Sequence, residues 1–229
     1  MTSPGQRLYW VLRERRPVAR TRHRLRRLWL IGRLRAEAAW LRSQVEVSIA
    51  RDAGIGPGVR VLVAPGTRSV LRVGRGGRLG AGVRIRLEGG QALIGDAVDI
   101  RRNASLVVGG RLELEGRIVL QAGCSLHCAE AITVRPLAVL SEYVTVVDSS
   151  HHYTGPDDWI LDNVHTRPVV IGYNTWIGAK ATVARGVRVG DHAVVAANSL
   201  VTSDVPAGHL VSGVPAEVRR PLDLPWRAG

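Results

Sequence analysis

The sequence contains no phenylalanine, and Phe, Trp and Tyr together make up only 4% of its 229 residues. A core without large aromatic side chains has to be built from small and branched residues packed in layers. Alanine, glycine, leucine and valine are abundant in this chain. The composition therefore favours a repetitive all-β architecture over an ordinary globular domain.

Cysteines and long apolar runs are scarce as well. Cys124 and Cys128 are the only two cysteines, and a Cys-x3-Cys spacing without a second ligand pair is not a zinc-binding pattern. We therefore interpret both as small buried apolar residues and expect no metal.

No apolar run approaches the ~18 residues that cross a bilayer. The N-terminus lacks the apolar core of a signal peptide, so we expect a cytoplasmic chain.

The positive charge is concentrated at one end of the chain. The formal net charge is +13, and residues 1–51 contribute +10 of it through thirteen arginines and three glutamates. The other 178 residues carry nineteen basic and sixteen acidic side chains, and Lys180 is the only lysine. The basic character is thus a property of an N-terminal segment and not of the body of the protein.

Aliphatic residues recur at a fixed step of six toward the C-terminus: Ile171, Ile177, Val183, Val189, Val195 and Val201. The residue two positions before each is small or branched: Val169, Thr175, Ala181, Val187, Ala193 and Ser199. A helix does not keep residues six apart on one face, whereas a short strand followed by a turn does. Each hexapeptide is therefore predicted to be a strand and a turn, stacked on its equivalent in the next coil about 4.8 Å away.

The same step continues upstream in blocks, with steps of eight or nine residues between blocks. The members are Val134, Leu140 and Val146; Val108, Leu114, Leu120 and Leu126; and Val73, Leu79 and Ile85, with Val61 two periods earlier. The longer steps indicate small insertions at corners. We predict an all-β fold, a parallel β-helix over residues 55–220, with a basic helical extension at 1–54 and a tail at 221–229. A polar excursion at 148–168 interrupts the repeat.

The hexads IGYNTW, IGAKAT, VARGVR and VGDHAV resemble those of the hexapeptide-repeat acyltransferases. The ending SLVTSDVPAGHLVSGVPAEV resembles the C-terminal coil of maltose and galactoside O-acetyltransferases and their relatives in polysaccharide biosynthesis. The likeness covers roughly residues 55–220. It implies a left-handed parallel β-helix with three hexads per coil, acetyl-CoA as acyl donor, and a homotrimer with active sites between subunits.

The excursion begins with Val147-Asp148-Ser149-Ser150-His151-His152-Tyr153. This run is similar to the Val-Asp-x-x-His-x-Tyr pattern that opens the catalytic loop of these transferases. The resemblance assigns the catalytic base to His151, with His152 as the alternative. A sugar hydroxyl is a poor nucleophile near neutral pH, and a histidine can take its proton as it attacks a thioester.

Neighbouring polar residues are further candidates. Asp148 could hold the imidazole of His151 or bind a sugar hydroxyl, or it could cap the loop. Glu142 could orient a histidine, and His127, about one coil earlier, could line the acceptor pocket. Family members often carry an asparagine upstream of the catalytic histidine, where this chain has Gln121.

The resemblance also implies a binding site for the acyl donor on the final coils. Trp176 matches a tryptophan that packs near the acyl group, and the backbone N–H of Ala179 matches a donor that faces the thioester oxygen. The small residues expected to let the pantetheine arm pass are Ala196, Ala197 and Asn198. The residues expected near the phosphates of coenzyme A are Thr202, Ser203, Arg219 and Arg220. Family members usually carry a basic residue at position 203 or 217. This chain has Ser203 and Glu217 there, so the two arginines would take over that contact.

An amphipathic helix is predicted from Leu25 onward, and Pro17 separates it from a shorter apolar segment around Leu8. Its apolar residues are Leu25, Leu28, Trp29, Ile31, Leu34, Ala38, Trp40 and Leu41. A dense basic cluster consists of Arg13, Arg15, Arg16, Arg20, Arg22, Arg24, Arg26 and Arg27. Three roles remain open: a cap on the β-helix, contact with an anionic membrane surface through residues 7–42, or nucleic-acid binding, for which no motif is present.

The leading hypothesis is an acetyl-CoA-dependent O-acetyltransferase acting on a hydroxyl of a sugar or glycan precursor. A zinc hydratase of the γ-carbonic-anhydrase type shares this fold but needs a second histidine five residues after His151, where the chain has Pro156. A non-catalytic β-helix scaffold is the third hypothesis. The sequence leaves open the acceptor, the length of the acyl group, and the choice between O- and N-transfer.

Overall fold

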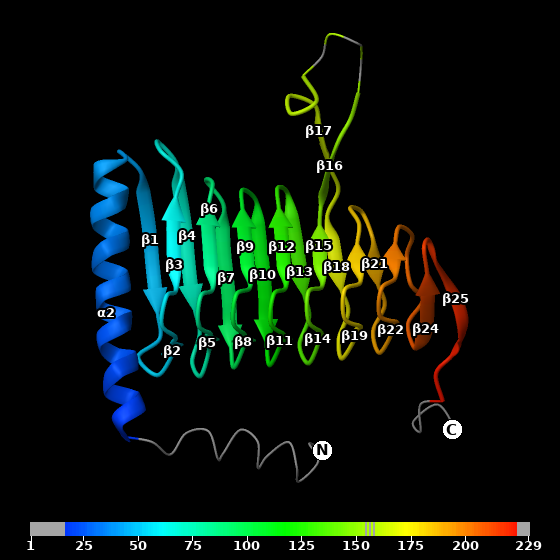
Figure 1. Cartoon of the computed structure of the whole chain (residues 1–229), viewed down its shortest axis with the longest axis horizontal. Coiled ribbons are helices and arrows are strands. Elements are labelled where there is room, and N and C mark those ends of the chain that lie inside the picture. Colours follow the sequence, from blue (N-terminus) through cyan, green and yellow to red (C-terminus); the bar gives the residue numbers. More distant parts are fainter. Residues whose placement is uncertain (1–16, 154, 156, 158, 224–229) are drawn as a thin grey trace.

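A computed structural model of the chain describes residues 17–153, 155, 157 and 159–223, with the backbone alone at residues 17–20. In this part of the chain, one helix precedes three sheets that wind into a solenoid, and their strands pair in parallel except for the last strand, which is antiparallel to its neighbour (Figure 1). A fourth sheet of two antiparallel strands projects from the solenoid. The apolar segment around Leu8 and the arginines at positions 13, 15 and 16 lie outside the described residues.

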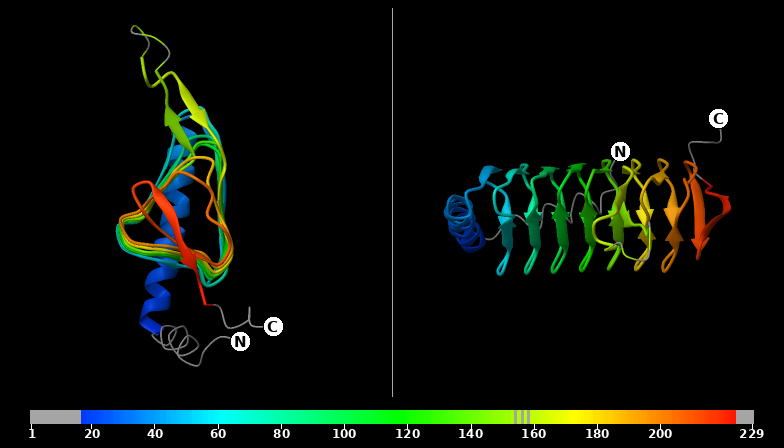
Figure 2. Two further views of the ribbon diagram at one scale, coloured as in Figure 1. Left: turned by 90° about the vertical axis from the view of Figure 1, so that its right-hand side faces the viewer. Right: turned by 90° about the horizontal axis from the view of Figure 1, so that it is seen from above.

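The three faces of the solenoid are three sheets, and each coil contributes one strand to each of them in turn. Sheet A consists of β1 (Gln44–Ile49), β4 (Arg68–Val73), β7 (Gln91–Asp96), β10 (Arg111–Gly116), β13 (Ala131–Val134), β18 (Val169–Ile171) and β21 (Arg188–Val189). Sheet B consists of β2 (Gly54–Ile55), β5 (Arg78–Leu79), β8 (Asp99–Ile100), β11 (Val119–Leu120), β14 (Val139–Leu140), β19 (Trp176–Ile177), β22 (Val194–Val195), β24 (His209–Gly213) and β25 (Ala216–Pro221). Sheet C consists of β3 (Arg60–Val63), β6 (Arg84–Leu87), β9 (Ser105–Val108), β12 (Ser125–Cys128), β15 (Thr145–Val147), β20 (Thr182–Val183) and β23 (Leu200–Val201). Viewed along the axis, the coils superimpose as a triangle (Figure 2).

The coils become shorter along the rod. The step between stacked core residues is 24 residues from Val61 to Ile85 and 18 residues from Val183 to Val201. Eighteen residues are three hexads, so the strict repeat predicted near the C-terminus is confirmed. Upstream, the extra residues lengthen the strands: β4 and β7 have six residues each, whereas β21 has two.

The interior of the solenoid is a column of aliphatic side chains. Every residue of the predicted six-residue step is buried, with at most 3% of its surface exposed. Burial raises the pKa of the Cys124 thiol to about 12. Burial, followed by the negative charge of Asp148, raises the pKa of the Cys128 thiol to about 12. Both cysteines are therefore protonated apolar residues of the core, as the sequence indicated.

The N-terminal helix α2 (Pro17–Trp40) lies across the first coil and covers the end of the solenoid (Figure 1). Leu30, Leu34 and Ala38 face the first coil and are buried. His23 lies with Nδ1 2.8 Å from the carbonyl oxygen of Ile55. Arg27 donates from Nη1 to a carbonyl oxygen of β1 at 3.1 Å. The helix therefore does cap the β-helix, which is the first of the three roles left open by the sequence.

The helix buries only part of the apolar stripe that the sequence indicated: Leu34 and Ala38 belong to it, whereas Leu30 does not. The buried residues recur at steps of four from Leu30, whereas Leu25, Leu28, Trp29 and Trp40 keep 62%, 51%, 60% and 82% of their surface exposed. Apolar side chains occupy both faces, so their periodicity did not distinguish inside from outside. Among the described helices, none combines the length and the apolarity needed to cross a membrane.

Candidate active site

The polar excursion forms a hairpin that stands out from one edge of the solenoid. Its strands β16 (Ser149–His151) and β17 (Val164–Thr166) pair antiparallel, with Ser149 opposite Thr166 and His151 opposite Val164. The hairpin leaves sheet C after β15 and returns to sheet A at β18, so it projects from the corner between these two sheets (Figures 1 and 2).

The imidazole of His151 is exposed, and its Nδ1 atom lies 3.0 Å from the carbonyl oxygen of Ile160. Because a carbonyl oxygen only accepts, Nδ1 must carry the proton in this contact. In the neutral imidazole, the lone pair then resides on Nε2, which is the atom free to act as a base. The contact with Ile160 therefore favours the tautomer of His151 in which Nε2 is the atom that can take a proton.

The adjacent His152 has different surroundings. Its backbone N–H donates to the carbonyl oxygen of Asn163 at 2.9 Å. Its ring lies against that of His165, with the ring centroids 5.1 Å apart. The carbonyl contact that orients Nδ1 of His151 therefore distinguishes it from its neighbour.

Asp148 lies at the root of the hairpin and is fully buried. Its two carboxylate oxygens accept hydrogen bonds from the backbone N–H groups of Ala129 and Glu130, at 2.7 and 2.8 Å. Its own carbonyl oxygen accepts from the N–H of Arg167 at 2.8 Å. This geometry is that of the loop cap, because the carboxylate ties the hairpin to the preceding coil and does not point into open space.

Replacement of Asp148 by alanine is expected to destabilise the protein by about 2–6 kcal/mol, because two backbone N–H groups lose a charged acceptor at about 1–3 kcal/mol each. Asp148→Asn keeps one acceptor oxygen and is expected to cost about half as much. Asp162, an exposed carboxylate of the same excursion, gives a matched control: Asp162→Ala is expected to change stability by less than about 0.5 kcal/mol. Denaturant unfolding measures all three variants, and an Asp148→Ala protein as stable as the control would contradict the anchoring role.

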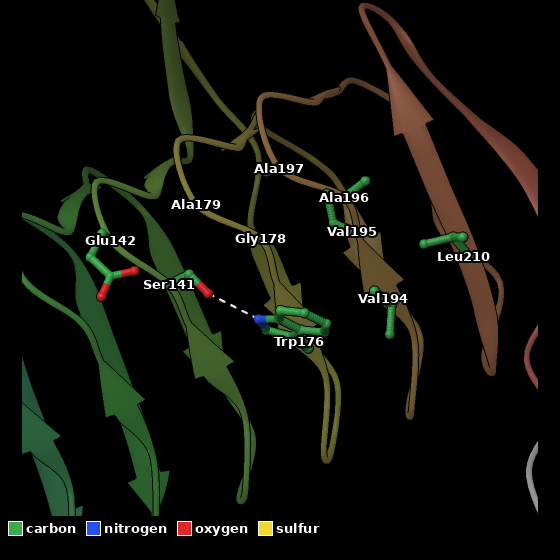
Figure 3. A pocket seen from close by; sticks show the side chains of 10 residues that line it. All are labelled: Ser141, Glu142, Trp176, Gly178, Ala179, Val194, Val195, Ala196, Ala197 and Leu210. Carbon is green, nitrogen blue, oxygen red and sulfur yellow. Dashed lines mark hydrogen bonds between the residues drawn. The ribbon is translucent and has the colours of Figure 1, made fainter.

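A shallow pocket of about 460 Å³ lies at another edge of the solenoid, between sheets B and C (Figure 3). Its lining consists of Ser141, Glu142, Trp176, Gly178, Ala179, Val194, Val195, Ala196, Ala197 and Leu210. Trp176 donates from its indole Nε1 to Oγ of Ser141 at 2.9 Å, which holds the ring along the pocket wall (Figure 3). The pocket is mostly apolar, with polar groups of Ser141 and Glu142 at one side.

Backbone packing gives the corner of this pocket its shape. A Cβ atom on Gly178 would come within 2.5 Å of the backbone nitrogen of Ala197, so only glycine permits this approach of two coils. The carbonyl oxygen of Ala179 accepts from the N–H of Asn198 at 2.9 Å. Among the described residues, neither the N–H of Ala179 nor that of Ala197 donates to another group of the protein. Two backbone donors are therefore available at the pocket for a negatively charged oxygen.

The predicted coenzyme A residues do not all lie together. Trp176, Ala179 and Ala197 line the pocket, and Asn198 follows it at the same corner. Thr202 and Ser203 follow β23, so they lie at the corner between sheets C and A, the corner that carries the hairpin.

Arg219 is engaged within the terminal hairpin of β24 and β25. Its guanidinium donates to Oγ and the carbonyl oxygen of Ser212 at 2.8 and 2.9 Å, and to the carboxylate of Glu217 at 3.3 Å. Arg220 donates to the carbonyl oxygen of Pro221 at 3.2 Å. These bonds use three of the five N–H donors of the Arg219 guanidinium, so two remain for a further acceptor such as a phosphate.

The other polar candidates are dispersed. His127 is exposed on sheet C, with Nε2 3.0 Å from Oγ of Ser125. Gln121 accepts from Arg101 at 2.6 Å. Glu142 lines the pocket. No group of three or more His, Cys, Asp and Glu side chains in the described part of the chain could hold a metal ion.

Sequence reasoning missed Ser141 and the apolar wall of Val194 and Leu210. Val194 stands one 18-residue coil after Trp176, and the two pair across β19 and β22. The 18-residue step alone could have found Val194. Leu210 pairs with Val194 through β24, which departs from that step.

One chain does not bring the hairpin and the pocket together. His151 projects from the corner between sheets C and A, whereas Trp176 and Ala179 lie at the corner between sheets B and C, so the strands of sheet C separate them. The hairpin also exposes large apolar side chains: Tyr153, Trp159, Leu161 and Val164.

Comparison with known proteins supports the repeat. Residues 168–203 match the model of the hexapeptide repeat of succinyl-transferase. A stretch of 59 residues is 48% identical to 2,3,4,5-tetrahydropyridine-2,6-dicarboxylate N-acetyltransferase of Staphylococcus aureus, covering 26% of this chain. The match spans about a quarter of the length of that relative.

Two solved structures share the fold over most of the chain. Polysialic acid O-acetyltransferase OatWY has a TM-score of 0.65 with 18% identity, and the match covers 78% of this chain and 87% of that one. The N-acyltransferase AntD from Bacillus cereus, in complex with dTDP and 3-hydroxybutyryl-CoA, has a TM-score of 0.51 with 20% identity, covering 79% and 83%. The chain is therefore a hexapeptide-repeat β-solenoid, as its sequence predicted, and the proteins that it resembles in sequence and in fold are acyltransferases.

Proposed function

We propose that the protein is an acetyl-CoA-dependent O-acetyltransferase that modifies a hydroxyl of a sugar or glycan precursor, with His151 as general base. The observation that carries the proposal is the contact of His151 Nδ1 with the carbonyl oxygen of Ile160, which leaves Nε2 as the basic atom on an exposed hairpin. The acyltransferases that share the repeat and the fold support it, and one of them holds an acyl-CoA together with a nucleotide.

In the proposed reaction, Nε2 of His151 takes the proton of the acceptor hydroxyl as its oxygen attacks the thioester carbonyl. The carbonyl oxygen becomes an oxyanion, and the N–H groups of Ala179 and Ala197 are the donors available for it at the pocket. Collapse of the intermediate breaks the carbon–sulfur bond. The leaving thiolate of coenzyme A then receives the proton from the imidazolium, which returns His151 to its starting form.

The donor fits the wall of sheet B in this proposal. Trp176, held by Ser141, would pack beside the acyl group, and the small side chains of Ala196 and Ala197 would admit the pantetheine arm. Asn198, Thr202 and Ser203 are the remaining polar candidates along the path, and Arg219 would join through the two N–H donors that its own hairpin leaves available.

We propose further that the enzyme works as a homotrimer whose sites lie between subunits. The hairpin of one copy would lie along the pocket of the next, which would bury Tyr153, Trp159 and Leu161 and carry His151 to Ala179. Three identical contacts of this head-to-tail kind close into a ring. A site between copies follows from the separation of the two corners within one chain.

The test is release of free coenzyme A from acetyl-CoA in the presence of a panel of nucleotide-linked sugars and glycolipid precursors. Acceptors with hydroxyl groups only, and matched amino sugars, distinguish O-transfer from N-transfer; acetyl-, succinyl- and 3-hydroxybutyryl-CoA compare the acyl groups. We expect binding of acetyl-CoA by calorimetry and transfer to at least one hydroxyl acceptor. A protein that binds none of these thioesters would be a non-catalytic scaffold and would contradict the proposal.

A further inference from the structure

The outer face of α2 is a second amphipathic surface, separate from the face that caps the solenoid. At 100° per residue, the residues that point away from Leu30 and Leu34 form one outward strip. Its members are Thr21, Leu25, Leu28, Trp29, Gly32, Ala36 and Ala39, and all of them are exposed. Apart from its chain neighbours and the adjacent helix backbone, no atom of the described residues lies within 4 Å of a Cβ built on Gly32, so the middle of the strip is open in this part of the chain.

Arginines border this strip on both sides. Arg24 and Arg35 lie along one edge, and Arg22, Arg26 and Arg33 lie along the other. The helix contains seven arginines and a single acidic residue, Glu37, whose carboxylate lies 3.5 Å from Arg33. The guanidinium carbon of Arg33 lies 5.5 Å from the centre of the Trp29 ring, which holds this tryptophan beside the positive edge.

An apolar strip with arginines on both edges and tryptophan at its border is the pattern of a helix that lies in the interface of an anionic bilayer. In such a position the acyl chains of the lipids bury the leucines, and the guanidinium groups bind lipid phosphates. A nucleic acid would engage the arginines but would leave Leu25 and Leu28 exposed to water. A second copy would bring one strongly positive face against another, which like charges disfavour.

The position of the helix suits a flat surface. Figure 1 shows α2 across the end of the solenoid, so the coils do not overhang its outer face. We propose that this face docks the protein on an anionic lipid bilayer, with α2 in the plane of the membrane and the solenoid axis along its normal. In the homotrimer proposed above, parallel solenoids would place three such helices on one side.

The docking geometry determines how far the pocket lies from the bilayer. What this distance implies for the acceptor rests on the proposed function. Sheet B carries Trp176 five coils beyond Ile55, and coils stack at about 4.8 Å, so the pocket lies about 24 Å further from the bilayer than the first coil. An acceptor linked to a lipid would have to present its hydroxyl at that distance, at the far end of an extended glycan. A short headgroup sugar would not reach.

Sedimentation of the full-length protein with vesicles tests the docking without any substrate. The vesicles contain phosphatidylcholine alone or phosphatidylcholine with phosphatidylglycerol. We expect binding to the anionic vesicles only, and weaker binding as salt is raised. Leu25→Gln with Trp29→Gln is expected to reduce binding at least tenfold. Arg24→Gln with Arg35→Gln is expected to reduce it roughly thirtyfold, from about fivefold per arginine.

The matched control is Arg102→Gln with Arg117→Gln, which removes the same charge from exposed corners of the third and fourth coils. This variant is expected to bind vesicles like the parent protein, and all variants should keep the parent's melting temperature, because the altered side chains are exposed. Absence of binding to anionic vesicles at low salt would overturn the proposal. Equal losses in the control variant, or binding of an RNA homopolymer that depends on Arg24 and Arg35 without any vesicle binding, would overturn it as well.

Discussion

Replacement of His151 by alanine is expected to lower the rate of acyl transfer by about 10²–10⁴-fold, which is the usual contribution of a general base. The loss should fall on kcat, because the base acts on the hydroxyl as its oxygen attacks. The side chain is exposed on the hairpin, so folding and donor affinity should stay close to those of the parent protein. Steady-state kinetics, together with calorimetric binding of coenzyme A, separates these effects.

Isosteric variants at the same position sharpen the test. His151→Asn retains a donor near the position of Nδ1 and can keep the contact with Ile160, but it has no basic nitrogen. It is therefore expected to be as slow as His151→Ala. His152→Ala is the matched neighbour and is expected to retain most of the activity. Near-normal turnover of His151→Ala combined with an inactive His152→Ala would transfer the role to His152.

Two inactive variants are expected to restore activity when they assemble together. In His151→Ala the base is missing, and in Ala197→Trp a large ring fills the exposed corner of the pocket. If the site lies between subunits, a mixed trimer contains sites with the hairpin of the Ala197→Trp copy and the pocket of the His151→Ala copy. Each mixed trimer, of either composition, contains about one such site in three, so roughly a third of the parent activity should return once the homotrimers are removed.

Co-expression of the two variants with different affinity tags, followed by tandem purification, provides the mixed oligomers. Each variant expressed alone is the control and should stay inactive. Recovery near the expected third would place the base and the pocket on different copies. If tandem-purified mixtures remain inactive, or if light scattering finds a monomer in an active preparation of the parent protein, the shared site is wrong.

The solenoid was predictable from the sequence because its contacts are between neighbouring coils. Each aliphatic residue of the six-residue step stacks on the residue one coil away, as Val183 does on Val201, so the periodicity of the sequence is also the periodicity in space. The absence of phenylalanine agrees with this packing, because layers of aliphatic side chains fill the narrow interior. The break at 148–168 was visible for the same reason, as the place where this step is lost.

Features outside the repeat depended on the tertiary structure. The stripe of α2 that faces the first coil could not be identified from the helix alone, since apolar residues occupy both sides and only packing against the first coil selects Leu30 and Leu34. The internal bonding of Arg219 depends on a hairpin turn that bends β25 back along β24. Neither feature repeats every six residues.

The candidate site, like the fold, was predictable from the sequence only in part. The sequence alone determined which residue types are available: a histidine pair at the start of an excursion, and a tryptophan followed by small residues on the last coils. Only the tertiary structure decided that Asp148 bonds to Ala129 and Glu130 and that Nδ1 of His151 faces Ile160. It also decided that hairpin and pocket occupy different corners. These contacts join segments that no repeat relates, so their geometry depends on how the hairpin turns and on where each corner points.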